Sequence, residues 1–252
     1  MAMNVIADSL LDRVKDIAPI IREHAAEAEE KRRLSRPVVD AMLQAGLYSM
    51  AHPKVFGGLE VDPLTMFRVV EEIARHDSAA GWNLQLAVAC NCFLAWLPDE
   101  GAAEIMNSPP NTIIATSFTP GRQAVPVDGG YRLRGQWPFV TGSHEGHWFL
   151  FLPQIMDGDQ PCLNDQGSPV QRFMFLPADK ATILDTWHTL GMRGTGSDDV
   201  VVSDLFIPER HRAIGPAGEA WHGVPGPAVP PDRLGAGGAP GSPGPRHSPR
   251  SH

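Results

Sequence analysis

The sequence predicts an α+β protein with an all-helical N-terminal domain, an antiparallel β-barrel-like middle domain and a disordered Gly/Pro-rich tail. Between Asp8 and about Met106, apolar residues return every three or four positions, the period of an amphipathic helix. Past residue 110 the period falls to two, and β-branched and aromatic residues become frequent. From about Gly215, glycine and proline dominate without any period. We therefore expect domains at 1–110 and 111–214, followed by a disordered tail at 215–252.

Capping residues mark the expected helices. Ser35 is a suitable N-cap with Pro37 in the first turn, and Asp62 plays the same part before Pro63. Asp77 comes directly before a third start. The expected helices are an amphipathic one from Asp8 that ends in the charged residues 27–33, then Ser35–Leu43, Leu64–Arg75, Ala79–Leu97 and Asp99–Met106.

The stretch Ala79–Leu97 is the least polar part of the N-terminal half, so we expect it to be the most buried helix. Its small residues permit close approach of another backbone or a ligand. Trp82 interrupts them, and it can be either a core residue or the wall of a ligand site. Asn83 and Asn91 are unusually polar for a buried helix, and buried amides need hydrogen-bond partners.

The segment Asn107–Pro110 is the clearest linker, and short strands follow it. No helix of crossover length lies between these strands, which favours an antiparallel sheet, closed or sandwich-like, over a parallel one. Residues 156–168 are expected to form a surface loop. The expected strands are Thr112–Thr116, Gln123–Val127, Tyr131–Arg134, Trp148–Pro153, Val170–Leu176, Ala181–Trp187 and Asp199–Ile207.

The stretch Gly129–Ser143 organises the β-domain. Asp128-Gly129-Gly130 supplies residues that tolerate positive φ, which predicts a hairpin. Gly135 and Pro138 then disfavour a regular central strand, so the chain has to bend. The pair Thr141-Gly142 places a hydroxyl beside an unhindered backbone at that bend. Such a pair suits a flat polar ligand, and it suits equally a bulged hairpin with core aromatics.

Charge and cysteine content exclude several classes of function. The 252 residues carry a net charge of −8, and the only basic run is Lys31-Arg32-Arg33, so nucleic acid is not an expected partner. The sequence has no basic, apolar leader and no apolar run long enough to cross a bilayer, which predicts a cytoplasmic protein. Cys90, Cys92 and Cys162 lack a matching Cys/His pair and are expected to be free thiols, not metal ligands.

The order of a helical domain, a Pro-rich join and a β-domain resembles the acyl-CoA dehydrogenase superfamily from about Asp12 to Arg212. The motif Gly-Tyr-x-Leu-x-Gly-x-x-x-Phe-Val-Thr-Gly, at residues 130–142, contributes most to this resemblance. The other matching features are Gly46-Leu47, Pro53 with Gly57-Gly58, residues 70–75 (VEEIAR), residues 190–197 (LGMRGTGS) and residues 206–209 (FIPE).

Within that superfamily, the details are similar to two-component flavin-dependent monooxygenases that hydroxylate aromatic compounds. The dehydrogenases carry acidic residues in the segment before the hairpin, whereas residues 116–121 here read TSFTPG. The motif at residues 136–142 (QWPFVTG) and the helix start at residues 77–82 (DSAAGW) are similar to the hydroxylase forms. An acyl-CoA dehydrogenase that uses FAD is the alternative.

The resemblance implies a role for five residues. Phe139 and Thr141 would flank the flavin ring, with the Thr141 hydroxyl near its reactive N5/C4a edge as the catalytic group. Thr116 and Ser117 would contact the ring from the neighbouring strand, and Trp82 would face the substrate. The cofactor implied is reduced flavin, FMN or FAD, delivered by a separate reductase. With oxygen it would hydroxylate a phenol-like small molecule.

The tail is where the chain departs from the resemblance. Family members continue with a helical bundle that forms one wall of the flavin site and assembles homo-oligomers, and here Gly/Pro-rich residues stand in its place. Their composition suits a linker or a reading frame translated out of phase. Two further interpretations therefore stay open: a truncated, inactive product, and a flavin-independent β-barrel binding protein. His144 and His147 are expected to be exposed and receive no catalytic role.

Overall fold

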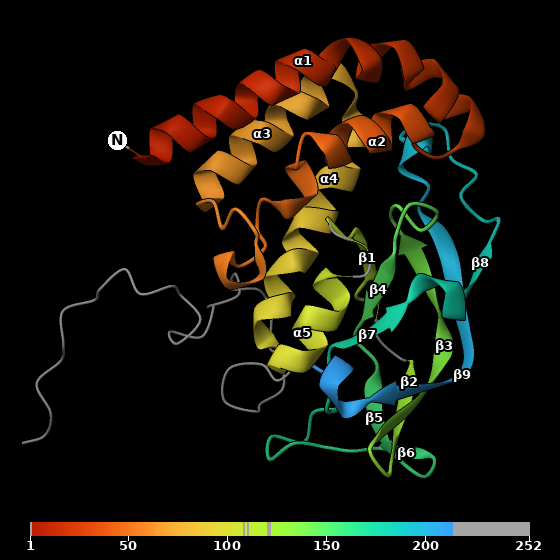
Figure 1. Ribbon diagram of the computed structural model, residues 1–252. Coiled ribbons are helices and arrows are strands. Elements are labelled where there is room, and N and C mark those ends of the chain that lie inside the picture. Colours follow the sequence, from red (N-terminus) through yellow and green to blue (C-terminus); the bar gives the residue numbers. More distant parts are fainter. Residues whose placement is uncertain (1, 108, 110, 120–121, 214–252) are drawn as a thin grey trace, which may run out of the picture.

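The computed structural model describes residues 2–107, 109, 111–119 and 122–213. The tail expected to be disordered at 215–252 lies outside these residues. Helices occupy the first half of the described chain and strands the second, as the α+β prediction required (Figure 1). The α-helices are α1 (Ala2–Lys31), α2 (Arg36–Gln44), α3 (Pro63–His76), α4 (Ser78–Asn91) and α5 (Asp99–Met106), with 3-10 turns at Leu47–Ser49, Lys54–Phe56 and Cys92–Trp96.

The helix starts follow the capping residues. Asp62 accepts a hydrogen bond from the backbone N–H of Thr65 at 3.0 Å, and Asp77 accepts from the N–H groups of Ala79 and Ala80 at 3.2 and 3.1 Å. Ser35 occupies the N-cap position of α2 without a side-chain cap bond. The expected helix Ala79–Leu97 is divided, since α4 ends at Asn91 and continues as a 3-10 turn.

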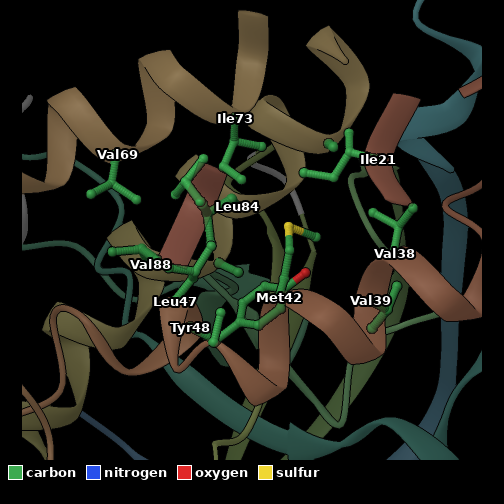
Figure 2. Close-up of a cluster of buried hydrophobic side chains, with 14 of the residues drawn as sticks. Ile21, Val38, Val39, Met42, Leu47, Tyr48, Val69, Ile73, Leu84 and Val88 are labelled. Atoms are coloured by element: carbon green, nitrogen blue, oxygen red, sulfur yellow. The ribbon is translucent and has the colours of Figure 1, made fainter. Parts of the chain in front are cut away.

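The helical core is one cluster of buried apolar side chains, mainly from α1, α2, α3 and α4, in which α3 packs against both α1 and α4. Figure 2 shows Leu84 and Val88 of α4 between Val69 and Ile73 of α3 and the side chain of Met42 from α2. Leu84, Ile73, Val69 and Met42 are fully buried. The two amides that α4 carries inward have partners: Asn83 donates to the carbonyl of Ala79 at 3.0 Å, and Asn91 to that of Tyr48 at 2.6 Å.

The β part of the described chain consists of two sheets. A three-stranded sheet has the order β1 (Ile114–Ser117), β4 (Trp148–Phe151), β7 (Met174–Pro177). A six-stranded sheet has the order β6 (Gln160–Pro161), β5 (Gln154–Asp157), β2 (Gln123–Val127), β3 (Gly130–Val140), β9 (Asp198–Pro208), β8 (Thr182–Leu184). Their inner faces share one core, in which Trp137 stacks on Phe151 with ring centroids 4.2 Å apart.

The expectation of a purely antiparallel sheet is wrong, because two strand pairs are parallel. β1 pairs with β4 in parallel, and β2 pairs with β5 in parallel. Parallel strands are usually joined by a crossover helix. Here each connection passes through the other sheet instead: the hairpin β2–β3 lies between β1 and β4, and β4 lies between β3 and β5. The region expected to be a loop at 156–168 also contains β6.

The predicted hairpin and bend are both present in β3. Val127 pairs with Gly130 across a turn in which Gly129 has φ +75°. The strand then runs on to Val140 against β9 with two irregularities, one near Gly135 and one between Trp137 and Val140. At the second, three steps along β3 match two along β9, so β3 holds an extra residue.

The described residues bear on two expectations from composition, one about membrane-spanning helices and one about the cysteines. None of the described helices is long and apolar enough to cross a membrane. The three cysteines are free thiols, with Cys90 buried and the other two half-buried.

Candidate functional site

The candidate site lies where the start of α4 meets the end of β3. Gly142 has φ +68°, and a Cβ atom built on it would lie 2.6 Å from the Oδ1 atom of Asn83. Glycine is favoured there on both counts, because other residues rarely adopt this φ and because the Asn83 amide occupies the space that a Cβ atom would fill. The helical and β parts therefore touch directly beside Thr141.

Thr141 and Trp82, two of the residues singled out by sequence, are joined by a hydrogen bond. The indole Nε1–H of Trp82 donates to Thr141 Oγ1 at 3.3 Å. The same oxygen lies 2.9 Å from Ser197 Oγ, and Ser197 Oγ lies 2.8 Å from Thr195 Oγ1. Sequence reasoning gave Ser197 and Thr195 no role. Their signal was present as two hydroxyls at alternate positions in the Gly-rich turn 191–197.

That turn is fixed at both ends. Arg193 donates from Nε to the carbonyl of Glu29 at the end of α1, at 2.8 Å. On the other side, the N–H of Gly142 donates to the carbonyl of Thr195 at 2.9 Å, and Ser143 Oγ donates to that of Gly196 at 3.0 Å. These bonds hold Thr195 and Ser197 against the end of β3.

Two aromatic rings at the site are exposed. Phe139 is 65% exposed and adopts φ +60°, and Trp82 is 43% exposed. The core interpretation of Trp82 is therefore wrong, because its ring points out of the helical core. A left-handed backbone costs a non-glycine residue about 1–2 kcal/mol. Such strain gathers at functional sites, where the surrounding structure imposes it. The ring of Phe139 meets that of Trp187 edge to face at 6.2 Å.

Thr116 reaches the site through its backbone, and Ser117 follows it in β1. Thr116 forms an isolated bridge with Thr141, which joins the two sheets at this end. Its hydroxyl donates inward to the carbonyl of Leu150 at 2.6 Å, and Ser117 Oγ lies 2.9 Å from Thr119 Oγ1. Both residues are buried.

A buried carboxylate holds the loop that carries Trp187. Asp198 is buried and accepts from the N–H groups of Thr186 and Trp187 at 2.8 and 2.9 Å. Its second oxygen lies 3.0 Å from His144 Nε2. His144 is exposed, as expected.

His147 and Glu145 lie in the turn between β3 and β4. Contrary to expectation, His147 is half-buried; its Nδ1 accepts from the N–H of Ile113 at 3.0 Å, and burial lowers its pKa. Burial also raises the pKa of the Glu145 carboxyl to about 7, against the opposing effect of Arg33. Both side chains are half-buried, so the exposed side of the site is formed by the aromatic rings.

The chemistry of the site suits a planar ring with a polar edge. The exposed indole of Trp82 is bonded to the buried Thr141 hydroxyl, β1 is bridged to Thr141, and the exposed ring of Phe139 lies two residues before it in β3. A flavin, with an aromatic face and hydrogen-bonding nitrogens along its edge, fits these residues. The described part of the chain brings no three His, Cys, Asp or Glu side chains together.

Comparison with known proteins also points to a flavin site. The family described as acyl-CoA dehydrogenase, N-terminal domain, matches residues 8–105. The oxygenase subunit HsaA of a flavin-dependent monooxygenase from Mycobacterium tuberculosis is 34% identical over 209 residues, covering 82% of this chain and 51% of HsaA. The oxygenase component of an FADH2-dependent resorcinol hydroxylase from a Rhizobium species is 31% identical, covering 81% and 48%.

A solved structure agrees with these relatives. XiaF from a Streptomyces species, in complex with FADH2 and glycerol, superposes with a TM-score of 0.76 at 31% identity, covering 84% of this chain and 52% of XiaF. The chain thus spans about half the length of the curated relatives it matches.

Proposed function

The chain belongs to the acyl-CoA dehydrogenase superfamily, and we propose on that premise that it acts in the oxygenase component of a two-component, flavin-dependent monooxygenase that hydroxylates an aromatic small molecule. The observation that carries the proposal is the junction of Trp82, Thr141 and the exposed ring of Phe139. The names of the similar proteins, an oxygenase subunit and a resorcinol hydroxylase component, support it.

Each residue of the site has a proposed task. Phe139 covers a face of the flavin ring and excludes water from it, and Thr141, the proposed catalytic residue, hydrogen-bonds to the ring edge. Thr116 and Ser117 border the ring through the end of β1. Trp82 forms the substrate side with its exposed indole. When bound, reduced flavin supplies the reaction with O2 and the transfer of an oxygen atom. The protein orients the partners and keeps the site dry.

The proposal extends to partners, location and domains. The cofactor is reduced flavin, FAD or FMN, and it comes from a separate reductase. The free cysteines fit the reducing cytoplasm. Residues 1–110 are a helical domain and residues 111–214 a β-domain, and the flavin binds where they meet. Assembly as a homo-oligomer belongs to the same proposal.

An acyl-CoA dehydrogenase is the second candidate, since the matching family is named for that activity. The two differ in what reduces the flavin. A dehydrogenase flavin is bleached by an acyl-CoA under anaerobic conditions, whereas a hydroxylase consumes O2 when a reductase supplies reduced flavin. An acyl-CoA that bleaches the bound flavin would refute the hydroxylase proposal.

The direct test is an anaerobic titration of the purified chain with reduced FAD and reduced FMN. We expect saturable binding that weakens about fivefold in Thr141→Val, the factor that one net hydrogen bond gives. The control is Thr189→Val, which removes a hydroxyl bonded to the carbonyl of Gly191 outside the site. Equal affinity of Thr141→Val and the parent chain would refute the role of Thr141, and absence of saturable binding would refute the flavin site in this chain.

A further inference from the structure

We infer that Ser197 and Thr195 are positioning residues that fix the Thr141 hydroxyl as a hydrogen-bond acceptor, so that the ligand atom facing it must carry a hydrogen. The inference rests on the proposed function only for the identity of that ligand. Its basis is the direction of a chain of hydrogen bonds from Trp82 to Met192.

The direction is set at the inner end of the chain. Thr195 Oγ1 donates to the carbonyl of Met192 at 2.9 Å. A hydroxyl has one hydrogen, so Thr195 can only accept from Ser197 at 2.8 Å. The single hydrogen of Ser197 is used in that bond. Ser197 must therefore accept from Thr141, across 2.9 Å.

The outer end agrees with this direction. An indole N–H is only a donor, so Trp82 donates to Thr141 Oγ1 at 3.3 Å. All bonds then run the same way, from Trp82 through Thr141, Ser197 and Thr195 to the carbonyl of Met192. In the reverse direction the hydrogen of Thr141 would have no acceptor among the residues that the structure describes.

Burial keeps water from restoring the reversed direction. Thr141 is 6% exposed, Ser197 3% and Thr195 2%. An unpaired hydroxyl hydrogen is costly in such surroundings, and aligned hydrogen bonds strengthen one another. Thr141 therefore keeps its hydrogen turned inward and presents its remaining lone pair to the site.

A ligand can use that lone pair only by donating. The N5 atom of reduced flavin bears a hydrogen, whereas N5 of oxidised flavin is a bare acceptor. If Thr141 faces that edge, the chain of hydroxyls selects the reduced form. Ser197 and Thr195 then determine which redox state binds, without touching the ligand.

Thr195→Val tests this at the far end of the chain. Without its acceptor, the hydrogen of Ser197 turns to Thr141, and the hydrogen of Thr141 turns outward as a donor. We expect the ratio of the oxidised-flavin Kd to the reduced-flavin Kd to fall about fivefold, the factor of one net hydrogen bond. For a two-electron couple this lowers the reduction potential of the bound flavin by about 20 mV.

Ser197→Ala should move the ratio in the same direction, which provides a second variant. Thr189→Val is the matched control, because it removes a threonine hydroxyl that donates to the carbonyl of Gly191 without joining the chain of hydroxyls. We expect it to leave the ratio unchanged. Equal weakening of both redox forms in Thr195→Val, or a shift of the same size in Thr189→Val, would overturn the inference.

A readout without flavin separates this inference from the proposed function. The indole N–H resonance of Trp82, assigned with Trp82→Phe, should move upfield in Thr195→Val and Ser197→Ala, because an interrupted chain weakens the bond to Thr141. No movement in either variant refutes the hydroxyl chain. If the Trp82 resonance moves in a protein that binds neither flavin form, the hydroxyl chain is supported and the proposed flavin function is refuted.

Discussion

Replacing Gly142 by alanine should destabilise the protein through two separable effects. The residue has φ +68°, where an alanine costs about 1–2 kcal/mol. The new methyl would also lie 2.6 Å from Asn83 Oδ1. Asn83 can turn away only by breaking its bond to the carbonyl of Ala79, which costs about 1 kcal/mol more. The sum is about 2–3 kcal/mol.

Gly167→Ala isolates the first effect. Gly167 has φ +75°, and a Cβ atom there would meet nothing within 4 Å. Gly167→Ala should therefore lower the free energy of unfolding only by the cost of the left-handed backbone, about 1–2 kcal/mol. In thermal unfolding followed by circular dichroism, each kcal/mol corresponds to about 2–4 °C in a chain of this size. Gly142→Ala should therefore melt about 4–12 °C below the parent, and Gly167→Ala about 2–8 °C below it, so that the two variants differ by about 2–4 °C.

The Asn83→Ala background completes the cycle. Without the amide, Gly142→Ala should cost no more than Gly167→Ala does, so the two sites should couple by about 1 kcal/mol. The reasoning is refuted if Gly142→Ala and Gly167→Ala melt together, or if the effects of Asn83→Ala and Gly142→Ala simply add. Either result would mean that α4 and the end of β3 do not press on each other at this point.

Three further predictions concern pH, capping and backbone strain. Burial raises the pKa of Glu145 to about 7 from 4.5, so its contribution to folding is present below pH 4.5 and is lost as pH rises through 7; Glu145→Gln should be the more stable protein at pH 8, by up to about 3 kcal/mol. Asp77→Ala should lower the free energy of unfolding by about 1 kcal/mol, because the N–H groups of Ala79 and Ala80 lose their acceptor, and Asp77→Asn should retain most of this stability. Phe139→Asn should raise the free energy of unfolding by about 1 kcal/mol, since asparagine tolerates positive φ, while the affinity for flavin should fall.

Each of these has a contrary result. Urea titrations at several pH values test the first prediction. A difference in the free energy of unfolding between the parent and Glu145→Gln that stays constant from pH 4.5 to 8 would contradict it. His52 supplies an internal contrast: burial lowers its pKa to about 4, so its contribution is present above pH 6.5 and lost as pH falls through 4. Equal stability of Asp77→Ala and Asp77→Asn contradicts the cap. A Phe139→Asn protein that is less stable than the parent contradicts the strain.

The elements set by local chemistry could be predicted from the sequence. Asp62 and Asp77 begin helices because their carboxylates satisfy N–H groups within three residues, and Asp128-Gly129 makes a hairpin because the turn needs positive φ. Strand pairing over long distances could not be predicted. The parallel partners of β1 and β2 lie beyond strands of the other sheet, and periodicity alone carries no information about such a connection.

The candidate site divides in the same way. Thr141 and Phe139 stand out because glycine and proline interrupt an alternating pattern around them. Ser197 is bonded to Thr141 across 56 positions of sequence, so its role appears only when β3 and the turn before β9 come together. Trp82 was ambiguous because an apolar helix is equally consistent with an inward or outward ring. Its exposure depends on how the start of α4 lies against the β part.

The second irregularity of β3 explains why one strand can serve both the core and the site. In a regular strand Trp137 and Phe139, two residues apart, would point to the same face. Trp137 is fully buried against Phe151, whereas Phe139 is exposed and Val140 is again fully buried. The extra residue and the left-handed backbone at Phe139 reverse the alternation, so the ring turns outward while the strand stays anchored on both sides. Directly after this reversal Thr141 lies within hydrogen-bonding distance of Trp82, where a regular strand would have continued along the sheet.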